Sequence, residues 1–208
     1  MSEPYAGGYL HRPSERSNCS LVLTHGAGSN CNAPLLVAVG EDLARRGWTV
    51  YRFDLPFRRK RAHGPPFPSG AKDDREGIRQ AVSRVGDDFP GRMFLGGHSY
   101  GGRQASMAAA EDSQLAAGLL LLSYPLHPPD KPAQLRTAHF PNLRTKTAFV
   151  HGSRDPFGSP DELRTALALI PAPTSLHMIE GAGHELGRPP RRAVEVVAEL
   201  AQGFLRED

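Results

Sequence analysis

The sequence is poor in the residues and patterns that several classes of protein require. Its 208 residues include only two cysteines, Cys19 and Cys31, and neither a C-x-x-C nor an H-E-x-x-H pattern. We therefore expect free thiols in a reducing cytoplasm and no metal site. No apolar run approaches the roughly 20 residues that a membrane span needs. Residues 1–18 carry no apolar core of a secretory signal, so a cytoplasmic protein without a membrane segment is expected.

The sequence also lacks a large excess of charge of one sign. The chain has 25 Lys and Arg against 22 Asp and Glu, a formal net charge of +3. Because no basic face is interleaved with aromatic residues, nucleic-acid binding is not expected. The one dense cluster is Arg58–Arg61, four consecutive cations. Such a run is ordinarily a solvated loop, and the alternative is a site that attracts an anionic substrate or an acidic partner.

The order of apolar and amphipathic segments predicts one α/β domain over residues 1–208. A chain of 208 residues with 39% hydrophobic residues has enough apolar side chains for one hydrophobic core and too few for two. Strands and helices alternate, which is typical of a mostly parallel sheet covered by helices on both faces, in three layers. Residues 1–18 are expected to form a short N-terminal extension, with at most one edge strand at Gly8–Arg12. The expected strands lie near 20–25, 48–53, 92–98, 118–123, 147–151 and 174–179, and the expected helices near 33–46, 72–86, 101–111, 160–169 and 190–205.

The most informative motif is Gly97-His98-Ser99-Tyr100-Gly101, which follows an apolar run and precedes a stretch of small residues. A serine on a sharp turn between a strand and a helix exposes its hydroxyl at the end of a sheet. Glycine is needed two residues before and after it, because side chains there would collide with the neighbouring strand and helix. The N-terminus of the following helix favours negative charge beside the serine. Ser99 is therefore the predicted nucleophile.

A serine nucleophile needs an acid and a base, which follow it along the chain when it occupies this kind of turn. Asp155 lies just after the apolar segment 147–150, and His184 lies in a glycine-rich loop after the segment 175–179. Each of the three side chains comes after its own expected strand, in the required order. We predict a catalytic triad of Ser99, Asp155 and His184.

Other acids and histidines are expected to have simpler roles. Asp161 and Glu162 follow Pro160 at the start of an expected helix, where carboxylates serve as caps. His151 is expected to pack beneath the acid loop, and His25 to begin a turn whose role is structural and depends on its backbone. The histidines that are expected to be solvated lie in Pro-rich or polar stretches, and they are His11, His63, His127 and His139.

A glycine-rich segment, His25-Gly26-Ala27-Gly28, follows the apolar run 21–24. It lacks the Lys-Ser/Thr ending of a P-loop and the spacing of a dinucleotide site, so nucleotide binding is not expected. In hydrolases with a serine elbow, one oxyanion donor is the N–H after the nucleophile and the other comes from an early loop. We predict the amides of Tyr100 and Ala27 as these donors, with Gly28 as the near alternative.

Several segments together resemble one branch of the α/β-hydrolases. They are His25–Gly28, the elbow with Arg103 after it, Leu122–His127 and Phe149–Asp155. The branch contains the testis-expressed thirty protein, the hydrolase-like region of subunit three of the NSL complex, and bacterial proteins called dienelactone-hydrolase-like. The resemblance spans roughly residues 20–205 and implies the α/β-hydrolase fold with neither a metal nor an organic cofactor. Dienelactone hydrolases proper use a cysteine nucleophile, whereas this chain has a serine.

These features predict a serine hydrolase that cleaves a small ester, thioester or lactone through an acyl-enzyme. No long insertion separates the expected strands 118–123 and 147–151, so the site is expected to lack a large cap and to admit small substrates. The competing function is a catalytically idle binding module, and a transferase or peroxidase with the same triad is a third alternative. Packing beneath the elbow is the alternative role for Arg103, Tyr124 and His127. The residues expected to line the substrate pocket are Gly28, Arg103, Tyr124 and His127.

Overall fold

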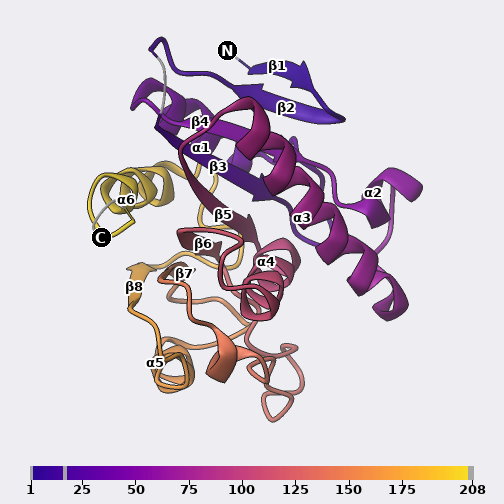
Figure 1. Ribbon diagram of the computed structural model, residues 1–208. Coiled ribbons are helices and arrows are strands. Elements are labelled where there is room, and N and C mark those ends of the chain that lie inside the picture. Colours follow the sequence, from indigo (N-terminus) through magenta and orange to yellow (C-terminus); the bar gives the residue numbers. More distant parts are fainter. Residues whose placement is uncertain (1, 16–17, 206–208) are drawn as a thin grey trace.

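The computed structural model describes residues 2–15 and 18–205, and it forms an eight-stranded sheet with helices around it (Figure 1). The expected strands and helices are all present, with ends that shift by a few residues at most. The strands are β1 (Ser2–Tyr5), β2 (Gly8–His11), β3 (Cys19–Thr24), β4 (Thr49–Phe53), β5 (Arg92–His98), β6 (Gly118–Leu122), β7 (Thr147–Gly152) and β8 (Thr174–Ile179). The helices are α1 (Pro34–Arg45), α2 (Pro56–Lys60), α3 (Ala71–Asp88), α4 (Tyr100–Glu111), α5 (Pro160–Leu167) and α6 (Arg191–Gln202), with 3₁₀ turns η1 (Pro68–Gly70) and η2 (Phe140–Asn142).

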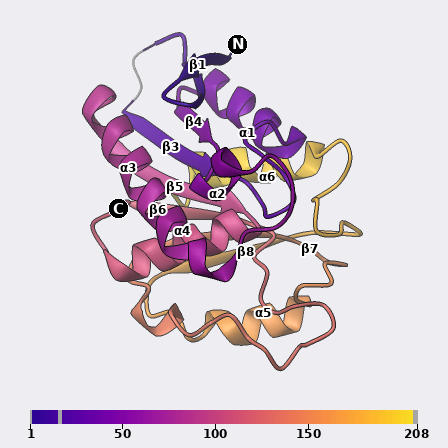
Figure 2. The ribbon, with the colours of Figure 1, turned by 90° about the vertical axis from the view of Figure 1, so that its right-hand side faces the viewer.

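The sheet is parallel except at one edge. Its strand order is β1-β2-β4-β3-β5-β6-β7-β8, and β1 and β2 alone pair antiparallel with their neighbours. Helices α1 and α6 cover one face, while α3, α4 and α5 cover the other (Figures 1 and 2). The carboxyl ends of parallel strands meet at one edge of such a sheet. The loops that follow β3, β5, β7 and β8 therefore share that edge.

Two apolar layers fix the sheet between its helices. Leu36, Val39 and Leu43 of α1 recur at helical spacing and are buried against one face of the sheet. On the other face, α3 buries Ile78 and Val85. The central strands are buried on both sides, as parallel strands usually are. The loops at their carboxyl ends thus extend from the buried centre of the sheet.

None of the helices among the described residues combines the length and the apolar character that crossing a membrane requires. Cys19 and Cys31 are both buried, and among the described residues they form no disulfide bond.

The N-terminal segment differs from the expected single edge strand at Gly8–Arg12. It forms a hairpin in which β1 and β2 pair antiparallel, with Tyr5 opposite Gly8. Between them, Ala6 and Gly7 both have positive φ, 46° and 81°. That conformation is typical of two-residue hairpin turns, because its twist matches the twist of the strands. The hairpin pairs with β4 through β2 and ends at His11.

Helix α2 was not expected from the sequence, where the basic run suggested a loop. Pro56 occupies the first turn, and the preceding Leu55 is extended, with φ −57° and ψ 149°. Proline is preorganised for the first helical turn and cannot continue an earlier one. The basic run therefore begins inside a short helix and continues into the loop after it.

Two of the histidines that were expected to be solvated are buried instead. His11 is 1% exposed and His127 is 4% exposed. Arg52 Nε donates to His11 Nε2 at 2.7 Å, and burial with that cation nearby lowers the pKa of His11 to about 4. His139 is half-buried, and burial lowers its pKa to about 4 as well. A polar local sequence was misleading here, because the partners that cover these rings lie far away along the chain.

Candidate active site

Ser99 occupies the turn between β5 and α4 in a strained conformation. Its φ is 53° and its ψ is −119°, values that residues other than glycine rarely adopt. A Cβ built on Gly97 would lie 2.6 Å from Gly102 N, and one on Gly101 would lie 2.5 Å from His25 O. The prediction that both glycines are needed for close approach is confirmed.

Ser99, His184 and Asp155 form a hydrogen-bonded chain at the carboxyl edge of the sheet. His184 Nε2 lies 2.8 Å from Ser99 Oγ, and His184 Nδ1 lies 2.8 Å from Asp155 Oδ2. A carboxylate can only accept, so Nδ1 carries the proton of a neutral ring and Nε2 accepts from the serine hydroxyl. Asp155 is 5% exposed, and its Oδ1 accepts the Phe157 N–H at 2.9 Å. In this tautomer, His184 is ready to remove a proton from Ser99.

Two further side chains hold His184 in place. His98, the residue before Ser99, lies with Nε2 2.9 Å from the backbone oxygen of His184. A carbonyl only accepts, so His98 carries its proton on Nε2, and burial lowers the pKa of this ring. Phe157 packs against the His184 ring, with 4.3 Å between the ring centroids. The backbone and the ring of His184 are thus fixed by separate contacts.

The loop of residues 25–30, after β3, passes close beside Ser99. A Cβ built on Gly26 would lie 3.3 Å from Ser99 Cβ and 3.0 Å from His98 Nδ1. The loop therefore approaches the elbow as closely as a glycine backbone allows. In the part of the chain that the structure describes, three amides at this junction have no protein acceptor, and they belong to Ala27, Gly28 and Tyr100.

His25 supports this loop from within. Its Nε2 accepts the Leu55 N–H at 3.1 Å, so its proton resides on Nδ1, which donates to Gly26 O at 2.8 Å. Ser29 N–H donates to the same carbonyl at 3.2 Å. Burial lowers the pKa of His25 and keeps the ring neutral in this arrangement. The turn was expected to depend on its backbone alone, and the structure adds the His25 side chain as its support.

The rival acids and His151 occupy the positions expected of them. Glu162 forms a capping box with Ser159 at the start of α5, and the side chain of Asp161 is 93% exposed. His151 Nε2 donates to Gly158 O at 2.9 Å and lies 3.5 Å from Asp155 Oδ2. His151 is therefore packed beneath the acid loop and is not bonded to Ser99.

The residues expected to line a pocket differ in how far they are exposed. Gly28 faces open space, since nothing lies within 4 Å of a Cβ built on it. Tyr124 is fully buried in the core, and its hydroxyl donates to a backbone carbonyl at 2.6 Å. His127 is almost completely buried too. Tyr124 and His127 are therefore packed inside the protein, which was the alternative to lining a pocket. Arg103 is half-buried one helical turn after Ser99, and among the described residues its Nε has no hydrogen-bond partner.

A recess of about 450 Å³ lies next to the candidate residues. It is lined by His98 and Glu185, the sequence neighbours of the serine and the histidine described above. Its other walls are mainly apolar and come from residues 33–36 at the start of α1 and residues 187–190 before α6. This recess has the lining expected for the apolar part of a small ligand.

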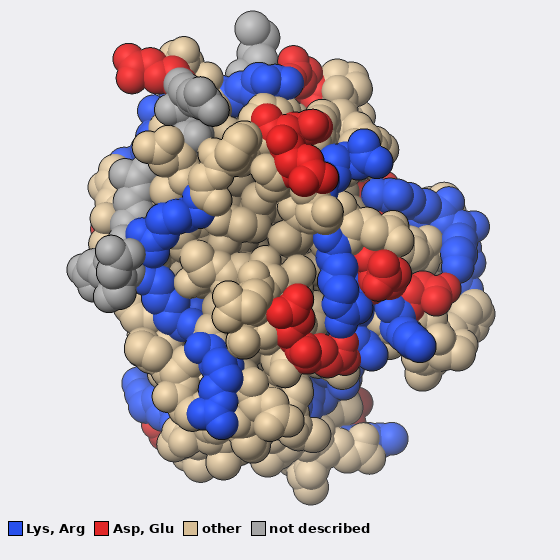
Figure 3. Space-filling view, in the orientation of Figure 1, with Lys and Arg blue, Asp and Glu red and all other residues tan. Residues whose placement is uncertain are grey.

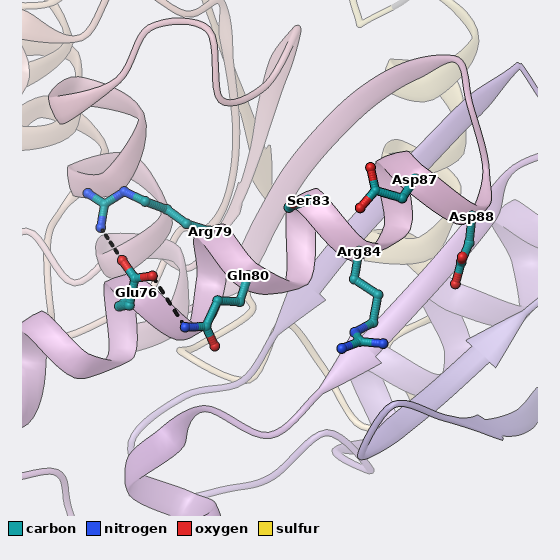
Figure 4. Close-up of a pocket in the computed structure, with 7 residues that line it drawn as sticks. All are labelled: Glu76, Arg79, Gln80, Ser83, Arg84, Asp87 and Asp88. Atoms are coloured by element: carbon teal, nitrogen blue, oxygen red, sulfur yellow. Dashed lines mark hydrogen bonds and ion pairs between the residues drawn. The ribbon is translucent and has the colours of Figure 1, made fainter.

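A second recess, of about 560 Å³, lies on the outer face of α3 (Figure 4). Its seven lining residues are all polar or charged and come from this one helix. Glu76 pairs with Arg79 at 3.6 Å and accepts from Gln80 at 3.2 Å. None of the lining residues is a histidine, so Ser83 has no base beside it there. The α3 recess is not a candidate active site.

Three residues with contacts at the site were not predicted from the sequence to have these roles. Phe157 packs on the His184 ring, His98 holds the backbone at His184, and Arg58 of α2 donates to the carbonyls of Ala27 and Ser29. For Phe157 and His98 a signal exists, because they lie within two residues of the acid and the nucleophile. For Arg58 no local pattern separates it from the three cations that follow it.

The sequence and the fold of this protein are similar to those of known hydrolases. Residues 17–204 match the family model described as an alpha/beta hydrolase domain. The dienelactone hydrolase from Anabaena variabilis is 22% identical with a TM-score of 0.72, and covers 93% of this chain and 88% of its own. A serine hydrolase without a lid from Xanthomonas campestris is 15% identical with a TM-score of 0.75, and the match covers 97% of this chain and 90% of that one. The esterase domain of a Rhodothermus marinus protein is 16% identical with a TM-score of 0.72, and the match covers 96% of this chain and 92% of that one.

At these identities the three structures show similarity of fold alone. The family model, in contrast, spans the chain from just before β3 to just after α6. It contains the serine elbow and all the loops at the carboxyl edge of the sheet. The predicted fold is thus confirmed, and this protein belongs to the alpha/beta hydrolase family.

Proposed function

We propose that this protein is a serine hydrolase that cleaves small carboxylic esters, thioesters or lactones through an acyl-enzyme. One observation carries the proposal, namely the two 2.8 Å hydrogen bonds that link Ser99, His184 and Asp155. The family and the fold shared with an esterase domain and a serine hydrolase support hydrolysis. Ser99, Asp155 and His184 are the proposed triad.

In the first half of the reaction, Ser99 Oγ attacks the carbonyl carbon of the substrate. His184 Nε2 removes the hydroxyl proton as the new C–O bond forms, and the carbonyl oxygen becomes an oxyanion. Asp155 keeps the ring in the required tautomer and stabilises the imidazolium. The imidazolium then gives its proton to the leaving oxygen or sulfur, the bond to the leaving group breaks, and an acyl-serine remains.

The amides of Tyr100 and Ala27 are the proposed oxyanion donors, with Gly28 as the near alternative. They flank Ser99 on the two segments that meet at the elbow, and protein acceptors do not occupy them among the described residues. Tyr100 also begins α4, whose N-terminus favours negative charge. Loss of one such donor typically reduces kcat by about 100- to 1000-fold.

In the second half, water replaces the leaving group. His184 removes a proton from the water, the hydroxide attacks the acyl carbon, and the same two amides hold the second oxyanion. The proton then returns to Ser99 Oγ as the acyl C–O bond breaks and the carboxylic acid leaves. Each cycle thus consumes one ester and one water and releases one acid and one alcohol. A thioester releases a thiol in place of the alcohol, and a lactone opens to a single hydroxy acid.

The surroundings of the proposed triad favour a small substrate. Between β6 and β7, the 3₁₀ turn Phe140–Asn142 is the one helical element among the described residues, so the site lacks a helical cap. The recess beside His98 and Glu185 is the proposed site for an apolar group of the substrate. Its volume of about 450 Å³ lies in the lower half of the range of small-molecule pockets.

The proposal is tested by looking for the acyl-enzyme directly. With p-nitrophenyl acetate, we expect a burst of nitrophenol equal to the enzyme concentration, and an acetyl group on the peptide that contains Ser99. A parallel screen of short esters, thioesters and lactones ranks the leaving groups. A folded protein that shows neither turnover nor acylation with any of them would contradict the proposal and favour an idle binding module.

A further inference from the structure

The basic run Arg58–Arg61 is not a uniform cationic patch. Figure 3 shows Lys and Arg side chains gathered at the right-hand end of the molecule, where Figure 1 places α2. Arg59 and Lys60 are exposed, and they bond to Asp54 O and the Asp73 carboxylate, at 2.8 and 2.9 Å respectively. Arg58 differs from them, because it is only 7% exposed. Its guanidinium points into the protein, so it cannot meet a substrate in solution.

The buried guanidinium of Arg58 bonds to backbone carbonyls from two loops. In the 25–30 loop, Nη2 donates to Ala27 O at 2.7 Å and Nε donates to Ser29 O at 2.8 Å. In the loop after α2, Nη1 donates to Arg61 O at 3.2 Å and Ala62 O at 2.7 Å, and Nη2 donates to Gly64 O at 3.2 Å. All five acceptors are carbonyls, whose dipoles compensate part of the cost of burying the cation. Arg58 therefore connects the two loops through one rigid fork.

These bonds determine which way the amides of the 25–30 loop point. The peptide units here are trans, and in a trans peptide the C=O and the N–H point in opposite directions. Because Arg58 holds Ala27 O, the Gly28 N–H faces away from the guanidinium. In the preceding peptide, His25 and Ser29 donate to Gly26 O. The Ala27 N–H of that peptide therefore points away from these two donors. Rotation of either peptide would replace a donor at this junction by a carbonyl oxygen.

We infer that Arg58 is a positioning residue that keeps the 25–30 loop in the conformation that presents its amides to the oxyanion. The inference rests on the proposed function. Arg58 touches neither the serine nor the substrate, and acts through the Ala27 and Ser29 carbonyls. It should affect the tetrahedral state, in which the oxyanion exists, and leave the binding of the ground-state ester almost unchanged. The first cation of the basic run thus serves the catalytic loop and does not recruit an anionic substrate.

The test compares Arg58→Ala and Arg58→Lys with Arg59→Ala, which removes the neighbouring exposed cation. Both Arg58 variants should lose about 10- to 100-fold in kcat while KM stays within about threefold. The Ki of an alkyl boronic acid, which forms a tetrahedral adduct on the serine, should rise by the same factor as kcat falls. Lysine keeps the charge but not the planar fork, so it should recover little activity. Arg59→Ala should match the wild type in all three constants.

Chemical rescue separates positioning from a general structural role. Low millimolar guanidinium chloride should restore part of the kcat of Arg58→Ala, whereas sodium chloride at the same concentration should not. Hydrogen exchange should accelerate in peptides that cover residues 25–30 and stay unchanged around His184. If Arg58→Ala does not fold, Arg58→Lys carries the same comparison of kcat, KM and Ki.

Failure of the role of Arg58 and failure of the proposed function would give different results. An active wild type whose Arg58 variants keep their kcat, lose activity only through KM, or leave the Ki of the boronic acid unchanged would overturn the role of Arg58 alone. A folded wild type that neither turns over esters nor binds the boronic acid would overturn the proposed function, and the role of Arg58 with it.

Discussion

Ser99 and Ser123 directly follow two neighbouring parallel strands, β5 and β6, and both have a positive φ. Their φ angles are 53° and 49°. Each donates its N–H at 2.8 Å to the strand beside it, Ser99 to Leu122 O and Ser123 to Val150 O. Their hydroxyls nevertheless differ. Ser99 Oγ bonds to His184, whereas Ser123 Oγ is buried and, among the described residues, has no hydrogen-bond partner.

The residues that follow each serine explain this difference. After Ser99, the chain enters helix α4, and the glycine at 101 lets the helix pass against the loop after β3. After Ser123, the Tyr124 ring enters the core and Pro125 follows it. A positive φ at the end of a strand therefore does not by itself place a serine hydroxyl beside a base. Ser99, the proposed nucleophile, differs from Ser123 in its flanking glycines and in the histidine within reach.

The largest expected effect comes from removing each hydroxyl in turn. Ser99→Ala should reduce kcat for a short ester by about 10⁴- to 10⁶-fold, because the attacking atom is gone. Ser123→Ala should stay within about twofold of the wild type, since its hydroxyl makes no hydrogen bond that would be lost. Steady-state hydrolysis and thermal unfolding of both variants check this pair. Similar losses in the two variants would show that the comparison between the two turns is wrong.

The next effect tests Asp155, the acid that bonds to His184. Asp155→Asn should reduce kcat by about 10³- to 10⁴-fold, because an amide at this place favours the wrong tautomer of His184. Asp161→Asn is the matched control, since Asp161 is the exposed rival acid at the start of α5. Its kcat should not change. Equal activity of the two variants would remove Asp155 from the proposed triad.

A third pair tests the glycines, which the Ser123 turn does without. A Cβ on Gly101 would lie 2.5 Å from a backbone oxygen, so Gly101→Ala should destabilise the fold by about 1–3 kcal/mol. For a domain of this size, such a loss lowers Tm by about 3–10 °C. Gly28→Ala meets nothing within 4 Å and should leave Tm unchanged. Calorimetry on both variants checks the contrast, and an unchanged Tm in Gly101→Ala would contradict the close approach.

Much of the fold could be predicted because its parallel strands are buried on both faces and therefore appear as continuous apolar runs. The order of Ser99, Asp155 and His184 could be predicted too, since each follows its own strand. The hairpin at Ala6-Gly7 and the helix that begins at Pro56 were missed, because each depends on a short turn signal.

Other features of the site could not be predicted at all. The burial of Arg58 and of His11 depends on partners tens of residues away, which no local pattern contains. Tyr124 was expected in a pocket from the resemblance and from its position, with packing as the alternative, and its ring lies in the core.

The smallest expected effect is a dependence of stability on pH, to which His98 and His139 contribute beside the Ser99 turn and helix α4. Burial lowers the pKa of His98, next to Ser99, and lowers the pKa of His139, which bonds to Ser106 of α4, to about 4. In the unfolded chain these rings regain a pKa of about 6.5. The unfolded state then binds more protons, so the stability these rings contribute is complete above pH 6.5 and declines as the pH falls toward 4.

Denaturant unfolding at several pH values measures this decline. Each proton should contribute a slope of up to about 1.4 kcal/mol per pH unit in the free energy of unfolding. His139→Gln should make the slope shallower, and His63→Gln, which replaces an exposed histidine, should not. Equal slopes in both variants and the wild type would contradict the assignment to His139.

The central claim, that Ser99 is an activated nucleophile, is tested most directly by intact-mass labelling with a fluorophosphonate. The wild type and Ser123→Ala should each gain one adduct per chain, and folded Ser99→Ala should gain none. A folded wild type that stays unlabelled, or a label that persists in Ser99→Ala, would contradict the account.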